Sequence, residues 1–288
     1  MILLPPIWEI IAAYIIEMRT RVRPEILEDQ LSIDRLCANP AAVEYLIANH
    51  TLDELNWSEL SANPTAMCLL RVHENFADYT ALSYNPAAID MLFRNGAPAR
   101  GTYRMALLTN PACVDLVVPS SSNITSRSEW SSYSRNPAAI DVLAESPECI
   151  DWQALSYNPG DGVEDLLRKH IDKVDWKGVS KNPSAIGLLL GNPRKIVLST
   201  LCGNPHPEAI KIIRKHIDDN GCAVNEGPNN IDNSMLSENP AAIDILLEHP
   251  DIIDYESISA NPAIFIPDTE LHAKNIAGYV ASIAIMLG

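Results

Sequence analysis

Histidines and a recurring set of serines are the residues with which this chain could do acid–base or nucleophilic chemistry. The seven histidines are His50, His73, His170, His206, His216, His249 and His272. No pair of them has HExxH spacing or a zinc-finger relation to the six cysteines. Four of them (His50, His170, His216 and His249) are expected near helix ends, where a polar group suits the helix dipole. The sequence therefore predicts structural histidines, with no metal and no cofactor.

The serines are too regular to indicate a nucleophile. They are Ser83, Ser134, Ser156, Ser180, Ser237 and Ser259. Each stands two residues before an Asn-Pro pair, whereas a catalytic nucleophile is normally singular and has a partner base. The chain also lacks a P-loop, a GxGxxG after a strand and a GxSxG elbow. We therefore expect no enzyme.

A third set of residues could form a stacking surface for bases or sugars. It consists of Trp57, Tyr79, Trp130, Trp152, Trp176 and Tyr255. The same place in the surrounding pattern is also filled by Leu198 and Ile33, which cannot stack on a base or sugar in this way. The pattern therefore favours packing between repeats over ligand binding.

The elements that position these residues come from an internal repeat. Asn-Pro occurs with the same surroundings at Asn39, Asn63, Asn85, Asn110, Asn136, Asn158, Asn182, Asn204, Asn239 and Asn261. The steps between these asparagines range from 22 to 35 residues, with 22 the commonest. A period of this size is typical of a solenoid or array, in which each unit buries its apolar face only against its neighbours.

Each Asn-Pro is expected to begin a helix of two to three turns. Counting the Asn as zero, small or apolar residues recur at +3, +4 and +7, as in Ala139, Ile140 and Leu143. This spacing places them on one buried stripe of a helix. Asn can accept a hydrogen bond from a free N–H of the first turn, and Pro at the first helical position loses no bond.

A second, shorter helix is expected in the other half of each unit. Position −7 is often Asp, as in Asp151, Asp175 and Asp254, and it is usually preceded by an aliphatic residue. If Asp caps the helix, the aliphatic residues at −8 and −3 form a hydrophobic staple. The unit is thus a helical hairpin, and Cys37, Cys113 and Cys202 replace small residues in packed slots of it.

These patterns predict an all-α fold, an α-solenoid of about ten 22-residue helical hairpins. Residues 1–30 are expected to form an N-terminal capping region, 31–266 the repeats, and 267–288 a C-terminal capping helix. The polar segments 119–129 and 218–230 are expected to be surface loops, and one-residue shifts are expected near Gly162 and His206.

Composition limits the partners and the location. A formal net charge of −16 and a pI near 4.7 argue against nucleic acid or an anionic membrane as a partner through a broad surface. The acidity looks like a solvated face spread over the helices. Cysteines without paired spacing favour reduced thiols and an intracellular setting, and the apolar N-terminus is too short to span a bilayer. The oligomeric state is left open.

The residue just before each Asn varies most between repeats, and variable positions carry recognition in repeat proteins. We call this series the variable track: Ala38, Ala62, Tyr84, Thr109, Arg135, Tyr157, Lys181, Gly203, Glu238 and Ala260. Tyr84, Arg135, Tyr157 and Lys181 are its candidate partner-binding residues. The predicted function is a non-catalytic scaffold, structural or for protein–protein interaction, with protein partners.

The motif LSxNPxAIxxL…IDW, seen at Leu82–Pro86 and Leu236–Pro240, resembles the short Asn-Pro repeats of proteins of giant nucleocytoplasmic DNA viruses. The resemblance covers about residues 31–266 and implies a viral repeat protein in the virion or host cytoplasm, of the minor capsid type. As an alternative, residues 4–11 resemble the first helix of an F-box. That resemblance implies an adaptor that recruits host proteins to a cullin ubiquitin ligase.

Overall fold

The computed structural model describes residues 20–94, 103–113, 124–221 and 230–268. These residues are mainly helical, as the predicted all-α class requires. Two strands of three residues each, β1 (Thr20–Val22) and β2 (Phe265–Pro267), are the exceptions within the described residues. Most of the two expected capping regions, 1–30 and 267–288, and all of the F-box-like segment 4–11 lie outside the described part of the chain.

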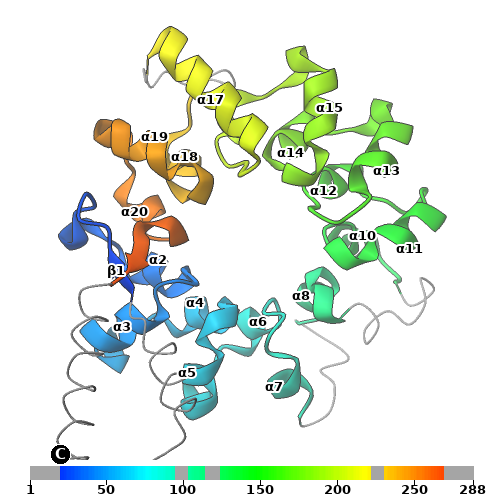
Figure 1. The fold of residues 1–288 in the computed structure, drawn as a ribbon. Helices are drawn as coiled ribbons and strands as arrows, with labels where there is room; N and C mark the ends of the chain where they lie inside the picture. The colour runs from blue at the N-terminus through cyan, green and yellow to red at the C-terminus, as the bar shows by residue number, and fades with distance from the viewer. Residues whose placement is uncertain (1–19, 95–102, 114–123, 222–229, 269–288) are drawn as a thin grey trace, which may run out of the picture.

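The helices form two tiers around a ring (Figure 1). The inner tier holds short helices that each end just before an Asn-Pro: α2 (Ile33–Ala38), α4 (Trp57–Ala62), α6 (Tyr79–Leu82), α8 (Arg104–Thr109), α10 (Arg127–Ser134), α12 (Trp152–Ser156), α14 (Trp176–Lys181), α16 (Leu198–Leu201), α18 (Asn233–Glu238) and α20 (Tyr255–Ile258). The outer tier holds the helices that follow Asn-Pro: α3 (Val43–Asn49), α5 (Met67–Val72), α7 (Ile89–Phe93), α11 (Ile140–Glu145), α13 (Val163–Lys169), α15 (Ile186–Gly191), α17 (Pro207–Asn220) and α19 (Ile243–Glu248).

Each asparagine caps its own unit, as predicted. In all ten, the side-chain oxygen accepts from the backbone N–H two residues later, as Asn136 Oδ1 does from Ala138 N at 2.9 Å. The first turn after Pro is usually a 3-10 turn, such as η7 (Pro137–Ala139), and the α-helix begins at the next residue. Asp151, Asp175 and Asp254 cap the short helices, as their spacing indicates.

The same asparagines also join each repeat to the one before it. Asn136 Nδ2 donates to the carbonyl oxygens of Leu108 at 2.9 Å and Asn110 at 3.1 Å. Asn158 Nδ2 donates to those of Ser134 and Asn136 in turn. Nine of the ten asparagines make this pair of bonds, and Asn204 makes one, to Ser180. All ten side chains are buried. Among the usual caps only Asn joins an acceptor oxygen to an NH2 group whose two hydrogens can reach two carbonyl oxygens, which explains its constancy.

A second ladder runs through the position two residues before the Asn in most units, and Leu108 interrupts it before Asn110. The hydroxyl of Ser156 donates to Trp152 O at 2.7 Å and accepts from the backbone N–H of Asp175, in the next repeat, at 3.0 Å. Cys37 and Cys202 replace serine in this ladder, and each sulfur accepts a backbone N–H from the following unit. These serines are therefore structural, as their regularity suggests.

The asparagine ladder closes on itself, so the repeats form a ring, which the predicted α-solenoid with a capping region at each end did not anticipate. Asn39 Nδ2 donates to the carbonyl oxygens of Ser259 and Asn261, each at 2.9 Å. Ser32 N donates to Ser259 Oγ at 2.9 Å. Strand β1 pairs antiparallel with β2, which brings the two ends of the described chain side by side (Figure 1). The first unit thus occupies the place that a further repeat would take after the last.

The units are less uniform than ten identical hairpins. Helices of the outer tier are described after eight of the ten Asn-Pro pairs, and after Asn261 the chain enters β2 instead. The one-residue shift of the repeat pattern that was predicted near Gly162 is confirmed. Gly162 lies just before α13 at φ +82°, and this left-handed conformation accommodates the extra residue between Asn158 and the helix. The prediction that 119–129 and 218–230 are surface loops was partly wrong. Residues 127–129 are the start of α10, and residues 218–220 are the end of α17.

Close packing at Gly160 provides a test of the junction between repeats. A Cβ added there would lie 2.4 Å from Pro137 O, a backbone atom that cannot move aside cheaply. We expect Gly160→Ala to lower the free energy of unfolding by about 1–3 kcal/mol. Gly191→Ala is the matched control, because nothing lies within 4 Å of its added Cβ, and it should be neutral or stabilising by up to about 1 kcal/mol. Urea unfolding followed by circular dichroism measures both, and equal effects would contradict the packing argument.

Candidate interaction surfaces

The repeated polar groups are committed to the ladders, which leaves the residues that differ between units as the candidates for recognition. Tyr84 is 52% exposed and Tyr157 is 38% exposed. Arg135 is exposed and Lys181 is half-buried. All four lie at or just after the C-terminal end of an inner-tier helix. The structure thus leaves the predicted candidates accessible, and whether they bind a partner stays a prediction.

Three of these four candidates lie in consecutive units. A Cβ added to Gly178 would lie 2.9 Å from Tyr157 Cδ2, so the tyrosine ring covers the start of α14. A Cβ added to Gly203 would lie 3.2 Å from Lys181 Cε, which places neighbouring positions of the variable track in contact. Tyr84 is set apart, since the unit of Thr109 lies between it and Arg135.

Electrostatics also link these neighbouring positions. Burial raises the pKa of the Tyr157 hydroxyl, the nearby Asp175 carboxylate raises it further, and the positive charge of Arg135 partly offsets both. The phenol therefore stays neutral at physiological pH and can both donate and accept a hydrogen bond. A neutral tyrosine near the Arg135 cation can donate to a carboxylate or carbonyl oxygen of a partner.

The aromatic set packs between units, with one exception. Trp57, Trp130, Trp152, Trp176 and Tyr255 are half-buried against the core. Tyr79 departs from the prediction, because it is 37% exposed and its hydroxyl lies 3.2 Å from Glu74 Oε1. Histidines pack on some of these rings: the centroids of His170 and Trp152 lie 4.6 Å apart, and those of His73 and Trp57 lie 5.7 Å apart.

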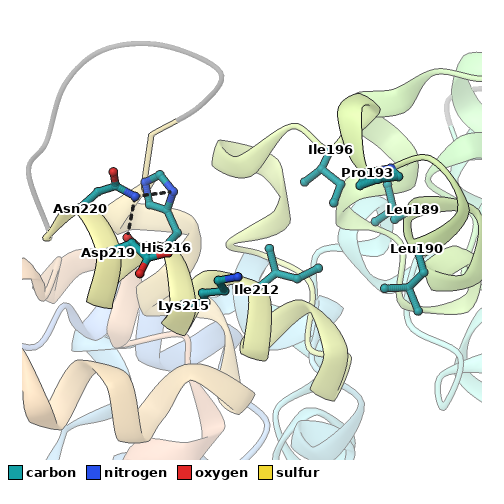
Figure 2. Close-up of a pocket in the computed structure, with 9 residues that line it drawn as sticks. All are labelled: Leu189, Leu190, Pro193, Ile196, Ile212, Lys215, His216, Asp219 and Asn220. Carbon is teal, nitrogen blue, oxygen red and sulfur yellow. Dashed lines mark hydrogen bonds between the residues drawn. The ribbon is translucent and has the colours of Figure 1, made fainter.

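Sequence reasoning missed a groove between α15 and α17, shown in Figure 2. It has a volume of 380 Å³. Its lining residues are Leu189, Leu190, Pro193, Ile196, Ile212, Lys215, His216, Asp219 and Asn220. The side nearer α15 is aliphatic, and α17 contributes one aliphatic residue followed by polar ones (Figure 2). The groove forms where the pattern is most irregular, because α17 has 14 residues where neighbouring α15 has 6.

Charge is also distributed unevenly, which the expectation of evenly spread acidity overlooked. Residues 168–215 carry ten of the 21 lysines and arginines but only three of the 37 aspartates and glutamates. We call this segment the basic sector, and it extends from the end of α13 into α17, around one side of the ring (Figure 1). The count of basic residues along the sequence was the signal that could have revealed it.

A second hollow, of 460 Å³, lies between the start of α10 and the turn before α12. Two acidic groups beside it, Glu129 and Asp151, already have partners within the protein. Burial raises the pKa of Glu129, but hydrogen bonds from Thr125 and the Arg104 guanidinium outweigh this and hold it at about 2. Asp151 accepts from Ala154 N at 3.1 Å. We therefore place the candidate sites on the variable track and in the groove.

Comparison with family models, with curated proteins and with solved structures finds no match for this chain. Among the described residues, no helix has the length and apolar character needed to cross a membrane. That same part of the chain holds no group of three or more His, Cys, Asp or Glu side chains placed to bind a metal ion. The fold and surfaces define a mainly helical ring built on Asn-Pro repeats.

Proposed function

We propose that this protein is a non-catalytic scaffold that binds a protein partner along the variable track. One observation carries the proposal. The side chains that repeat are used to hold the ring together, while the positions that vary leave Tyr84, Arg135 and Tyr157 exposed. Exposed tyrosine and arginine are the residues most often found at the energetic centre of protein interfaces.

Combined substitution of the track tests the proposal. Tyr84→Ala, Arg135→Ala, Tyr157→Ala and Lys181→Ala together should reduce capture of partner proteins by more than about tenfold, since each such residue can contribute over 1 kcal/mol. Quantitative mass spectrometry of affinity captures measures the loss, and circular dichroism checks that helicity is intact.

A matched control carries the same number of exposed substitutions away from the track. Leu52→Ala, Arg71→Ala, Arg127→Ala and Ile171→Ala remove two aliphatic side chains and two cations, all exposed. This control variant should capture the same partners as the unaltered chain. Unchanged capture by the track variant, or an equal loss in both variants, would contradict the proposal.

The location of this scaffold, in the virion or in the host cell, is predicted only from the resemblance to giant-virus repeat proteins and stays a prediction. A particle component should be enriched in purified virions at a fixed ratio to the major coat protein. A host-directed cullin adaptor should instead be found in the infected-cell lysate and lose its ligase partner when residues 1–20 are removed.

A further inference from the structure

We propose that the groove between α15 and α17 binds an acidic amphipathic helix of a partner protein. The inference is independent of the variable track, because it depends on different residues and a different tier of the ring. It joins two observations, an uncovered aliphatic wall and a local excess of positive charge around it.

The aliphatic wall is suited to side chains from a helix. Leu190 is 51% exposed, although it lies on an outer-tier helix whose other leucines, Leu188 and Leu189, are buried. Pro193 and Ile196 continue the same wall, and Ile212 faces it from α17 (Figure 2). Aliphatic residues at positions i, i+3 and i+4 of a partner helix would cover this wall and remove Leu190 from water.

The charge around the groove favours acidic residues beside that stripe. Arg194 and Lys195 are exposed in η10 (Pro193–Lys195), between two residues that line the groove. Lys215 lines the opposite side and is also exposed. No ion pair engages these three cations within the described residues. Asp219 stands at one end of the groove, so the carboxylates of the partner belong beside the lysines rather than there.

The combination selects one class of partner. A nucleic acid would satisfy the cations but would leave Leu190 and the wall around it exposed. A neutral apolar helix would cover the wall but not use the excess charge. A helix with aliphatic residues on one face and glutamates or aspartates at its edges satisfies both, and the charges would speed its association.

The test uses the full chain and a fluorescein-labelled peptide of about 18 residues, long enough to form a helix on binding. Leucines follow helical spacing in this peptide and glutamates occupy the edges, while a scrambled peptide keeps the composition without the stripe. Fluorescence anisotropy should show saturable binding of the first peptide. We expect Lys195→Glu with Lys215→Glu, and separately Leu190→Glu, to weaken it by about tenfold or more.

Lys169→Glu with Lys177→Glu is the matched control, since both lysines are exposed in the basic sector and neither lines the groove. This pair should change the affinity by less than about threefold. The quadruple track variant should bind the peptide normally, which separates this proposal from the preceding one.

Several results would overturn the proposal. They are the absence of saturable binding, equal binding of the scrambled peptide, or an equal loss in the lysine control. Tighter binding of a single-stranded oligonucleotide that displaces the peptide would show a site for nucleic acid instead. A dimer in sedimentation that Lys195→Glu with Lys215→Glu abolishes would show that a second copy of the chain fills the groove.

Discussion

Asn136→Asp is expected to lower the free energy of unfolding by about 3–5 kcal/mol, although it changes one side-chain atom. The Asn136 amide is fully buried and donates to two carbonyl oxygens of the preceding units. A carboxylate there can still accept from Ala138 N, but it cannot donate to either carbonyl. Its negative charge would instead be buried against both oxygens. Urea unfolding at neutral pH measures the loss.

The pH dependence of this variant distinguishes lost hydrogen bonds from buried charge. Burial and the two carbonyl oxygens should raise the folded-state pKa of the substituted carboxyl above its unfolded value of about 3.9. The charge penalty is then complete above the folded pKa and is relieved as the pH falls toward the unfolded value. Asn136→Ala loses both donated bonds and also the capping bond from Ala138 N, but it carries no charge, so its stability should not follow this titration. The stability of Asn136→Asp should instead be lowest at neutral pH and recover in acid.

Asn75→Asp is the control, because Asn75 is exposed in η4 (Glu74–Phe76). It should change stability by about 0.5 kcal/mol or less. A loss at Asn136 no larger than at Asn75 would mean that the ladder contributes little to stability.

A disulfide across β1 and β2 is expected to form within one chain and to stabilise it by up to about 5 kcal/mol. Arg21 and Ile266 are directly opposite each other in the antiparallel pair, and neither is buried. Opposed residues of such a pair have Cα atoms about 4.5–5.5 Å apart, within the range of a disulfide. The bond would close a loop of about 245 residues, which removes much of the entropy of the unfolded chain.

The measurement uses Arg21→Cys with Ile266→Cys in a chain whose Cys68, Cys149 and Cys222 are serine. Oxidation should give a monomer with altered mobility on a non-reducing gel and a mass lower by two hydrogens. Arg21→Cys with Glu145→Cys is the control, because α11 lies across the ring from β1, and it should not crosslink within the chain (Figure 1). Crosslinks only between chains would contradict ring closure.

Local rules account for much of the fold. The spacing of Ala139, Ile140 and Leu143 correctly placed a helix after Asn136, and Asp151 correctly marked the start of α12. Closure of the ring could not be predicted, because the contact between Asn39 and Asn261 depends on the small rotation that each unit adds. A hint was available nonetheless. Serine or aspartate would cap a helix equally well, so ten asparagines without exception indicate that the amide donates as well.

The candidate sites were partly predictable. Variation among repeats picked out Tyr84, Arg135 and Tyr157, which are exposed, but the other seven positions of the variable track are half-buried. The groove was not predictable in the same way, because residues 218–220 were expected to be loop and are instead the last residues of α17. A repeat pattern predicts the positions that recur in every unit. The groove instead depends on the unit that contains α17, which departs most from the pattern.

The direction of the asparagine ladder has a consequence for how the chain folds as it is synthesised. Nine asparagines donate to carbonyl groups that precede them in the sequence, so each new unit can dock on one already made. Asn39 alone among the ten donates forward, to Ser259 and Asn261. Its amide must wait until the chain as far as Asn261 has left the ribosome. The first unit to be made is therefore the last to be completed, and an interrupted chain presents an edge with no acceptor for Asn39.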